Sequence, residues 1–193
     1  MNELRRQLRK QRRQLNCFQQ RQAENQIFHK LIRHPNFKNA QRIGIYLHAF
    51  GEIRTQKIIE YAFSKGKKVY LPKICNMNQC LVWVQISQQQ YRTKRFATHL
   101  FGMLEPMASR GLHVSHLDLL LMPLLACDIY GTRIGMGGGF YDRTLASAPK
   151  YPLRFGLTHH FQLIKEKLPR QAWDQSLDCL ITPTQSLQFM RKQ

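Results

Sequence analysis

The sequence predicts a single α/β domain over residues 1–193, in which a mostly parallel, Rossmann-like sheet lies between helices on both faces to give three layers. Three observations support this. Residues 42–71 are predicted to form strand, helix and strand in quick succession, which is a βαβ unit with parallel strands and a right-handed crossover. The apolar run at 119–122 has the length of a buried strand and stops at Pro123, which lacks the N–H of the next ladder position. A chain of 193 residues also suffices for one complete core.

The chain is expected to begin with one long helix over residues 1–34, because apolar residues recur there at helical spacing. This apolar stripe consists of Leu4, Leu8, Leu15, Phe18, Ile27, Leu31 and Ile32. The first turns are rich in arginine, and these side chains are predicted either to be solvated or, as a cluster, to close over phosphates. His34, Pro35 and Asn36 are expected to end the helix.

The remaining elements follow from local patterns. Residues 42–47 alternate like a strand, Thr55 is predicted to cap a helix that contains residues 58–63, and Pro72 is expected to halt a strand at 68–71. Further strands are predicted at 80–86, 154–158 and 177–182, the last of which is expected to close the sheet. Residues 88–98 are expected to be a loop and residues 161–168 a short helix.

The glycine-rich stretch at 131–139 is the strongest functional signal in the sequence. Five glycines fall within these nine residues, and such a density lets backbone N–H groups converge on one anion. Arg133 and Arg143 flank the glycines, and a guanidinium group can hold two phosphate oxygens at once. A helix is expected to begin near Phe140 and to direct its positive end at an anion. Asp142 follows two residues later, and its carboxylate is a ligand of the kind that magnesium prefers. The stretch therefore predicts a phosphate-binding loop, although the glycines alone fit a solvated surface turn equally well.

Composition and charge narrow the classes of function. Thirty Lys and Arg residues against eleven Asp and Glu give a net charge of +19, which calls for a polyanionic partner: nucleic acid, nucleotide or a polycarboxylate. Five cysteines without a C-x-x-C pair indicate reduced thiols and hence a cytoplasmic location. The longest apolar run is too short to span a bilayer. The sequence has neither a zinc-ligand pattern nor a G-x-S-x-G elbow, and its glycines match neither a Walker loop nor a dinucleotide fingerprint.

Two further carboxylates and one aromatic residue are candidates for the site. Glu52 is the only acid in the turn at 48–54, which follows the first predicted strand at the carboxyl end of the sheet, where parallel sheets bind ligands. Asp178 lies at the near end of the last predicted strand, where it either caps a turn or joins Asp142 as a second metal-directed oxygen. Phe101 lies in a turn-rich segment and either packs or stacks on a planar ligand.

The glycine-rich stretch and the strand before it resemble the signature of the 5-formyltetrahydrofolate cyclo-ligase family, also called 5,10-methenyltetrahydrofolate synthetases, through DLLLMPLLACD and then YGTRIGMGGGFYDRTL. The similarity extends over nearly the whole chain. It includes LRRQLRKQRRQL, IGIYLHAFGEIRTQKII, KKVYLPKI, FGMLEP and WDQSLDCLITPT. The order of these motifs makes the resemblance specific.

The resemblance implies an enzyme that uses ATP and Mg²⁺ to convert 5-formyltetrahydrofolate, with or without a polyglutamate tail, into 5,10-methenyltetrahydrofolate, ADP and phosphate. In such enzymes ATP is expected to phosphorylate the formyl oxygen, after which the folate's N10 amine attacks the activated carbon and phosphate leaves. Positioning and charge neutralisation can support this transfer without a protein nucleophile. We expect a monomer without a membrane partner or a specific nucleic-acid partner.

By similarity, the functional residues of the family fall into three groups in this chain. ATP would be held by Arg5, Arg6 and Arg9 and by the run Arg133, Ile134, Gly135, Met136, Gly137, Gly138, Gly139, Phe140 and Tyr141. Folate would contact Leu47, Glu52, Phe101, Met136 and Phe140, with Glu52 hydrogen-bonded to the pterin. Arg133, Tyr141 and Asp142 would be catalytic, and Asp142 and Asp178 would be directed toward magnesium.

The sequence departs from the family pattern at its amino terminus and in the glycine-rich stretch. The lysine of the family's K-x-x-x-R element coincides with Met1, whereas Arg5 matches its arginine. Phe140 stands where many members carry tyrosine, which excludes a hydroxyl role there, and Met136 and Gly138 replace basic residues of some relatives. Two alternatives stay open: a basic RNA- or ribosome-associated binding module, and a sugar-phosphate or nucleotide-binding enzyme.

Overall fold

The sheet at the centre of the computed structural model is mostly parallel, as predicted. The structure describes residues 2–75, 77–100, 102–108 and 110–191. Seven strands lie in the order β12-β11-β9-β6-β1-β2-β3, and neighbours are parallel except in the two edge pairs, β2 with β3 and β11 with β12. These strands are β1 (Arg42–Gly44), β2 (Lys68–Cys75), β3 (Cys80–Ile86), β6 (Leu119–Pro123), β9 (Leu153–Leu157), β11 (Cys179–Ile181) and β12 (Ser186–Gln188).

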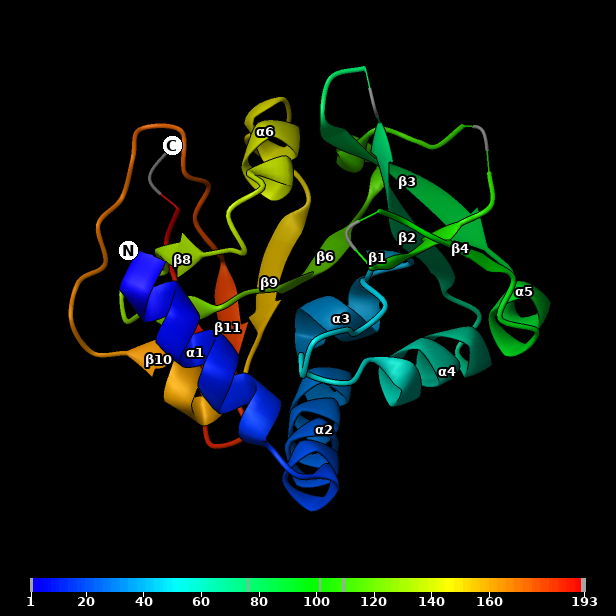
Figure 1. The fold of residues 1–193 in the computed structure, drawn as a ribbon. Coiled ribbons are helices and arrows are strands. Elements are labelled where there is room, and N and C mark those ends of the chain that lie inside the picture. Colours follow the sequence, from blue (N-terminus) through cyan, green and yellow to red (C-terminus); the bar gives the residue numbers. More distant parts are fainter. Residues whose placement is uncertain (1, 76, 101, 109, 192–193) are drawn as a thin grey trace.

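Helices cover both faces of this sheet. One face carries α2 (Cys17–Arg33), α3 (Pro35–Asn39) and α4 (Gln56–Ser64), whose buried residues form a first core with those of β1, β2, β6, β9 and β11. The other face carries α6 (Phe140–Ala146) and the short 3-10 helix η1 (Val114–His116) over a second core. Figure 1 shows α2, α3 and α4 on one side of the strands and α6 on the other. The three layers follow from these two cores.

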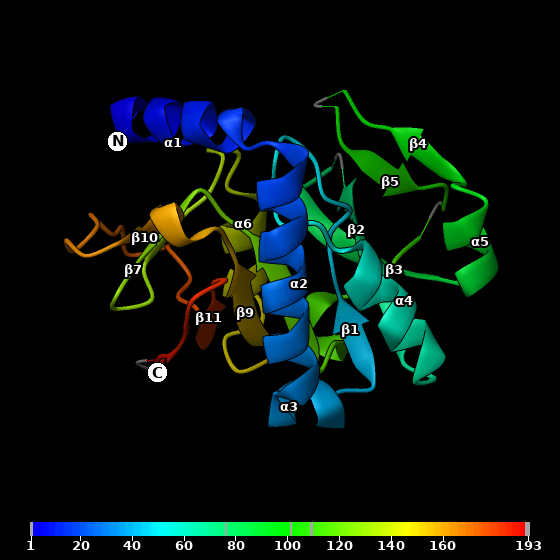
Figure 2. The ribbon, with the colours of Figure 1, turned by 90° about the horizontal axis from the view of Figure 1, so that it is seen from below.

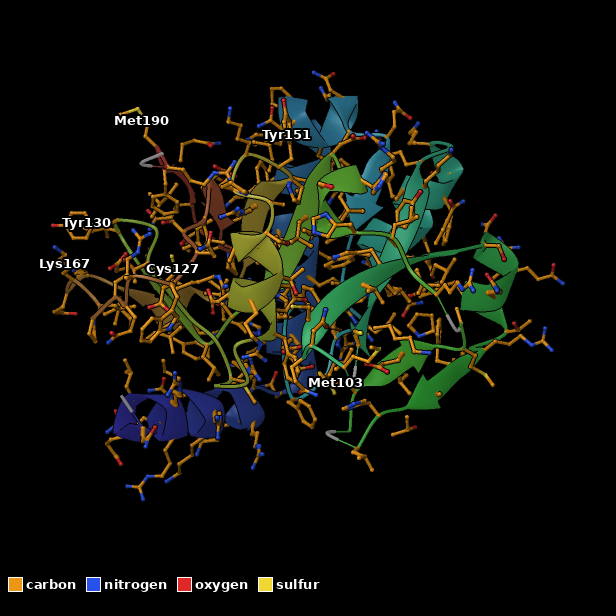
Figure 3. All side chains as sticks on the ribbon, turned by 90° about the horizontal axis from the view of Figure 1, so that it is seen from above. Met103, Cys127, Tyr130, Tyr151, Lys167 and Met190 are labelled. Carbon is orange, nitrogen blue, oxygen red and sulfur yellow. The ribbon has the colours of Figure 1, made fainter. Side chains whose placement is uncertain are left out.

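Helix α1 (Asn2–Gln14) lies outside the three layers, over a small sheet of β7 (Ala126–Asp128), β8 (Arg133–Ile134) and β10 (Leu163–Ile164). Leu8 of α1 is buried in a third cluster against β7 and β8. Figure 2 shows α1 turned across the end of α2. Within the small sheet Cys127 is fully buried, whereas Tyr130, in the turn between β7 and β8, points outward (Figure 3). None of the described helices has the length and apolar character needed to cross a membrane.

The prediction of one helix over residues 1–34 is wrong, because the chain turns between α1 and α2. Asn16 is the N-cap of α2, and its Oδ1 accepts a hydrogen bond of 2.9 Å from the Gln19 N–H. The Gln19 side chain accepts one of 3.0 Å from the Asn16 N–H in return. Such a capping box starts a new helix and stabilises it by about 1 kcal/mol. The periodic apolar stripe continues across the break, which is why it suggested one element.

Pro72 does not end its strand, contrary to the prediction. The N–H of Lys68 donates to Gln41 and the carbonyl of Tyr70 accepts from Ile45, so alternate residues of β2 face β1. The nitrogen of Pro72 therefore also points to the β1 side, but β1 pairs with β2 only as far as Tyr70. Because no ladder bond is required there, proline is tolerated while β2 continues along β3.

Other boundaries differ from prediction in smaller ways. Residues 161–168 are not a helix: η2 (His160–Gln162) is followed directly by β10. Residues 88–98 contain α5 (Gln88–Arg92) and β4 (Phe96–Thr98), which pairs with β5 (Leu104–Pro106). The strand at 177–182 does not close the sheet, because β12 is added outside it. Thr55 does precede α4, but its hydroxyl donates to the Tyr46 carbonyl rather than capping the helix.

Candidate active site

The glycine-rich stretch connects β8 to α6 through a loop, residues 135–139, whose middle three residues are exposed. Gly137 and Gly139 have φ values of +110° and +66°, in the region that favours glycine, and Gly139 is the N-cap of α6. A Cβ atom on Gly139 would lie 2.7 Å from Nη1 of Arg143. The chain follows this path because it lacks side chains there, and its main-chain groups are left accessible to a ligand.

One face of α1 holds this loop. Nε of Arg5 donates to the Gly135 carbonyl at 3.2 Å, and Nη2 of Arg9 donates to the Met136 carbonyl at 2.9 Å. Residues four apart share a helix face, which explains why both arginines reach the loop. Arg6, predicted to help them, lies on the solvent side of α1 and forms an ion pair of 2.9 Å with Glu3.

Arg133 and Asp142 form an ion pair of 2.6 Å that joins β8 to α6 beneath the loop. Only 3% of the Arg133 side chain is exposed, and its guanidinium lies 5.9 Å from the centre of the Tyr141 ring. Burial raises the pKa of Tyr141, so this phenol stays protonated at neutral pH. The three predicted catalytic residues are therefore in one cluster.

Two buried guanidinium nitrogens beside the loop have no hydrogen-bond partner among the described residues: Nε of Arg9 and Nε of Arg133. A buried donor without a partner costs about 1–3 kcal/mol, and more when it is charged. Arg9 contacts Met136, and Nη1 of Arg133 lies within 4 Å of where a Cβ on Gly135 would be. Both nitrogens therefore border the same segment, and an anion on the loop would satisfy them.

Glu52 lies in the turn after β1, as predicted for the carboxyl end of the sheet. Its Oε2 accepts a hydrogen bond of 3.0 Å from the Ala49 N–H, and its Oε1 lies 3.9 Å from Nη1 of Arg12. Burial raises the pKa of Glu52, while the Arg12 charge and the Ala49 N–H oppose this shift. The Glu52 side chain is 11% exposed, and among the described residues the Ala49 N–H is its one close neutral donor, which leaves the carboxylate able to bind a ligand.

Arg12 joins the Glu52 turn to the glycine-rich loop, a role that its place in the amino-terminal arginine cluster, predicted to be solvated or to close over phosphates, did not reveal. Its side chain is 1% exposed. Nε donates to the Phe50 carbonyl at 2.8 Å, and Nη2 lies 3.8 Å from the Met136 sulfur. The available signal was its spacing, seven residues after Arg5 and four after Leu8, on the buried face of α1.

His159 is a second residue that sequence analysis missed. Its Nε2 lies 3.1 Å from the Gly51 carbonyl, so this nitrogen carries the proton. Burial lowers the pKa of His159 to about 4, and the Arg12 charge acts in the same direction. The neutral imidazole therefore holds the Glu52 turn in place. A histidine in a strand-to-helix connection gives no such signal by itself.

The other predicted residues have varied surroundings. Leu47 packs against the first core, Met136 is 44% exposed on the loop, and Phe140 packs on the second core under the Arg143 guanidinium. Arg143, which flanks the glycines, donates to the carbonyls of Gln79 and Gly138, so it supports the loop. Phe101 lies outside the described residues.

The carboxylate Asp178 is engaged by the protein on both oxygens. Oδ2 accepts from the Arg154 N–H at 2.7 Å, and Oδ1 pairs with Nε of Arg191 at 2.7 Å. No described contact joins it to Asp142. The contacts of Asp178 therefore do not support its prediction as a second magnesium ligand.

Asp142 alone fits a magnesium ion that is bound largely by substrate. Arg133 and the Gln175 N–H both donate to its Oδ1, and Oδ2 accepts no bond from the described residues. Among these residues no group of three or more His, Cys, Asp or Glu side chains gathers around a metal position. Magnesium that is bound together with a nucleotide needs only one or two protein carboxylates, because phosphate oxygens supply further ligands. Asp142 is therefore sufficient for a magnesium ion that arrives with a nucleotide.

The fold and the site together define a class: an α/β enzyme in which arginines and a glycine-rich loop can hold an anionic substrate beside a half-buried carboxylate. The model of the 5-formyltetrahydrofolate cyclo-ligase family matches residues 1–183. The chain therefore belongs to the 5-formyltetrahydrofolate cyclo-ligase family.

Individual relatives support this membership. The chain is 36% identical over 182 residues to the 5-formyltetrahydrofolate cyclo-ligase of Escherichia coli, covering 92% of this chain and 97% of the relative. It is 33% identical over 175 residues to the Haemophilus influenzae enzyme of the same name, covering 89% and 91%. The solved structure of Aquifex aeolicus 5,10-methenyltetrahydrofolate synthetase matches with a TM-score of 0.82 at 26% identity, covering 100% of this chain and 94% of that one. A Mycoplasma pneumoniae synthetase, at 19% identity and a TM-score of 0.74 over 94% and 98% of the two chains, shares the fold.

Proposed function

We propose that this protein uses ATP to convert 5-formyltetrahydrofolate into 5,10-methenyltetrahydrofolate, with release of ADP and phosphate. One observation supports the proposal most directly. Two arginines beside the glycine-rich loop, Arg9 and Arg133, each have a buried Nε that lacks a partner among the described residues, and Arg12 connects that loop to the turn that carries Glu52. A site for phosphates and a site for a polar heterocycle thus adjoin each other.

In the phosphoryl transfer, the protein positions the two substrates and neutralises the negative charge of the phosphates. ATP would lie on residues 135–139, with Arg9 and Arg133 donating their unpaired Nε–H groups to phosphate oxygens. The terminal phosphoryl group of ATP passes to the formyl oxygen and leaves ADP. The N10 amine attacks the activated carbon and gives up its proton to solvent or to the departing phosphate, and the bond from this carbon to the phosphate oxygen breaks. Each of these steps spreads negative charge near Arg133, which stabilises it electrostatically.

Magnesium supplies charge neutralisation on the phosphates when it is bound, and Asp142 is the carboxylate that would hold it. Its free Oδ2 is available for this, while Oδ1 remains tied to Arg133. The same ion pair keeps the Arg133 guanidinium directed at the loop. Asp142 therefore acts on both the ion and the arginine.

The folate side of the site is carried by Glu52. A carboxylate can accept two hydrogen bonds from the amino group and ring N–H of a pterin. Within the part of the chain that the structure describes, Oε1 of Glu52 has only the Arg12 guanidinium, 3.9 Å away, as a partner. Leu47, Phe140 and the exposed Met136 would provide apolar contacts, and Phe101 remains a proposed stacking residue. We also propose that the protein acts as a monomer and accepts polyglutamylated folate.

The test is to incubate the purified protein with MgATP and 5-formyltetrahydrofolate and to follow the absorbance of methenyltetrahydrofolate. We expect product formation that requires both substrates and releases one ADP for each methenyl product. Thermal stabilisation by ATP without any response to the folate would overturn the proposal and favour a nucleotide-binding enzyme of another kind.

A further inference from the structure

The C-terminal segment after β11 contacts the chain on both sides of the unit formed by β8, the glycine-rich loop and α6. Strand β12 and the residues after it lie beyond residue 183, where the match to the family model ends. β12 pairs antiparallel with β11, with Leu187 opposite Leu180, and the Phe189 N–H then donates to the Asp178 carbonyl at 2.8 Å. This pairing brings Phe189 and Arg191 to two places that are far apart in the sequence.

Phe189 packs on the turn that precedes the loop. A Cβ atom on Gly131 would lie 2.8 Å from Cγ of Phe189, so the ring rests directly on the glycine backbone. Gly131 has a φ of +83° and its carbonyl accepts from the Leu177 N–H at 3.2 Å. Gly131 lies two residues before Arg133, and the ring therefore packs on the turn that leads into β8, the strand before the loop.

Arg191 contacts the chain on the other side, after α6. Its Nη1 donates to the Pro149 carbonyl at 3.0 Å and its Nη2 donates to the Lys150 carbonyl at 2.8 Å, just after α6. Its Nε pairs with Oδ1 of Asp178 at 2.7 Å, with 17% and 14% of the two side chains exposed. The Arg191 guanidinium thus binds both Asp178, directly before β11, and the segment after α6.

We propose that Phe189 and Arg191 form a C-terminal clasp, anchored on Asp178, that positions the glycine-rich loop for the phosphates of ATP. This inference rests on the proposed function. A loop of several glycines loses much conformational freedom when it orders around a ligand. Holding the turn before β8 and the segment after α6 in the free protein restrains the two elements that carry the loop, so less freedom remains to be lost and the clasp lowers the concentration of ATP needed for binding.

The first test substitutes Arg191. Arg191→Ala is expected to raise KM for ATP about 5- to 20-fold while KM for 5-formyltetrahydrofolate and kcat change less than about two-fold, because Glu52 lies on another connection. Arg191→Lys keeps a positive charge for Asp178 but cannot donate to both carbonyls at once. Its KM for ATP should lie between the values of the unaltered protein and of Arg191→Ala. Met190→Ala, at a side chain that is 98% exposed, is the matched control and should leave all three constants unchanged. Equal changes in both KM values would overturn the clasp.

The second test separates an anchor from a metal ligand at Asp178. If Asp178 anchors the clasp, Asp178→Asn should raise KM for ATP as Arg191→Ala does, and the double variant should be no worse than either single variant. The magnesium concentration for half-maximal rate should stay unchanged in all three. A higher magnesium requirement in Asp178→Asn alone would overturn the role as anchor.

A third measurement does not depend on turnover. Hydrogen exchange of the free protein should become faster in residues 131–139 and 147–150 of Phe189→Ala and Arg191→Ala, while β6 keeps its protection. Unchanged exchange in both segments would refute the clasp even if the enzyme is active. If the unaltered protein makes no methenyl product, the proposed function fails, but the exchange result still decides whether the clasp holds the loop.

Discussion

At the scale of single residues, the pair Arg133 and Asp142 carries the most chemistry. The ion pair is short and almost buried, so Asp142 both neutralises Arg133 and directs it at the loop. An arginine fixed in this way needs no reorganisation when charge develops on a phosphoryl group. The pair therefore explains how two residues nine apart in sequence act as a unit.

Asp142→Asn should lower kcat by about 100-fold or more at saturating ATP and magnesium, because it removes a charge and keeps the volume. The loss of the ion pair should also reduce the free energy of unfolding, by up to about 3 kcal/mol. Turnover and thermal unfolding measure the two effects separately. Asp174→Asn, in a more exposed turn near Gln175, is the control, and full activity of Asp142→Asn would contradict the assignment.

Glu52→Gln should raise KM for 5-formyltetrahydrofolate about 10-fold or more, since an amide offers one acceptor where a carboxylate offers two. KM for ATP should change little. The control is Glu60→Gln, an exposed glutamate on α4. If only the ATP constant moved, Glu52 would belong to the nucleotide side of the site.

His159 predicts a dependence of stability on pH. Burial lowers its pKa from 6.5 to about 4, so the folded protein binds the proton less well than the unfolded chain does. The contribution of the neutral imidazole to the free energy of unfolding is therefore complete above pH 6.5. It is lost as the pH falls toward 4, and the loss amounts to up to about 3 kcal/mol. Relative to His159→Gln, the unaltered protein should lose stability in this range. Parallel pH profiles of the two unfolding free energies would show that the imidazole is not held neutral.

At the scale of elements, α1 is a separate unit that brings Arg5, Arg9 and Arg12 to the site. It docks through Leu8, which is 4% exposed against Ala126, Ile134 and Leu168. The layers of the main sheet do not need it. Its docking therefore affects ligand binding more than folding.

Leu8→Ala should loosen α1, because removing a buried leucine side chain costs about 2–5 kcal/mol in a well-packed site. We expect a higher KM for ATP, recovery of the rate at high ATP, and faster tryptic cleavage among the arginines of α1. Gln11→Ala, at an exposed position of the same helix, should match the unaltered protein. Equal trypsin sensitivity of Leu8→Ala and the control would contradict this role of α1.

Several elements were predictable because their residues carry local signals. The strand at 80–86, the parallel βαβ unit and the start of α6 were all predicted from period and from glycine or proline. The break at Asn16 was not, since the apolar stripe runs through it. Pro72 misled because its tolerance depends on where β1 ends, which is a tertiary fact.

The residues of the candidate site could likewise be predicted only where they carry a local sequence signal. The glycines, Arg133 and Glu52 are recognised by type and position. Arg12 and His159 contact backbone carbonyls of a turn distant in sequence; the spacing of Arg12 indicates that it is buried, but no local pattern marks the carbonyls that these two side chains contact. Asp178 illustrates a different limit: its position suggested either a turn cap or a metal ligand, and its pairing with Arg191, thirteen residues later, carries no local signal.

At the scale of the whole molecule, the net charge of +19 exceeds what the site requires. Arg12 and Arg133 in the site are buried and Arg5 and Arg9 are half-buried, whereas Arg6, Lys10 and Arg13 on the outer face of α1 are exposed to solvent. Exposed charges attract any polyanion and are screened by salt, while buried ones are screened much less. The two populations should therefore respond differently to ionic strength.

A single-stranded RNA oligonucleotide should bind at low salt without sequence preference and lose about 100-fold or more in affinity between roughly 50 and 200 mM salt. Turnover should change less than about three-fold over that range, because Arg133 and Arg12 are shielded from solvent. Sequence-specific RNA binding that survives physiological salt would instead mean that the outer face of α1 has a nucleic-acid partner of its own. The salt dependence of the two activities in one preparation thus decides whether the excess charge serves the folate reaction or a second role.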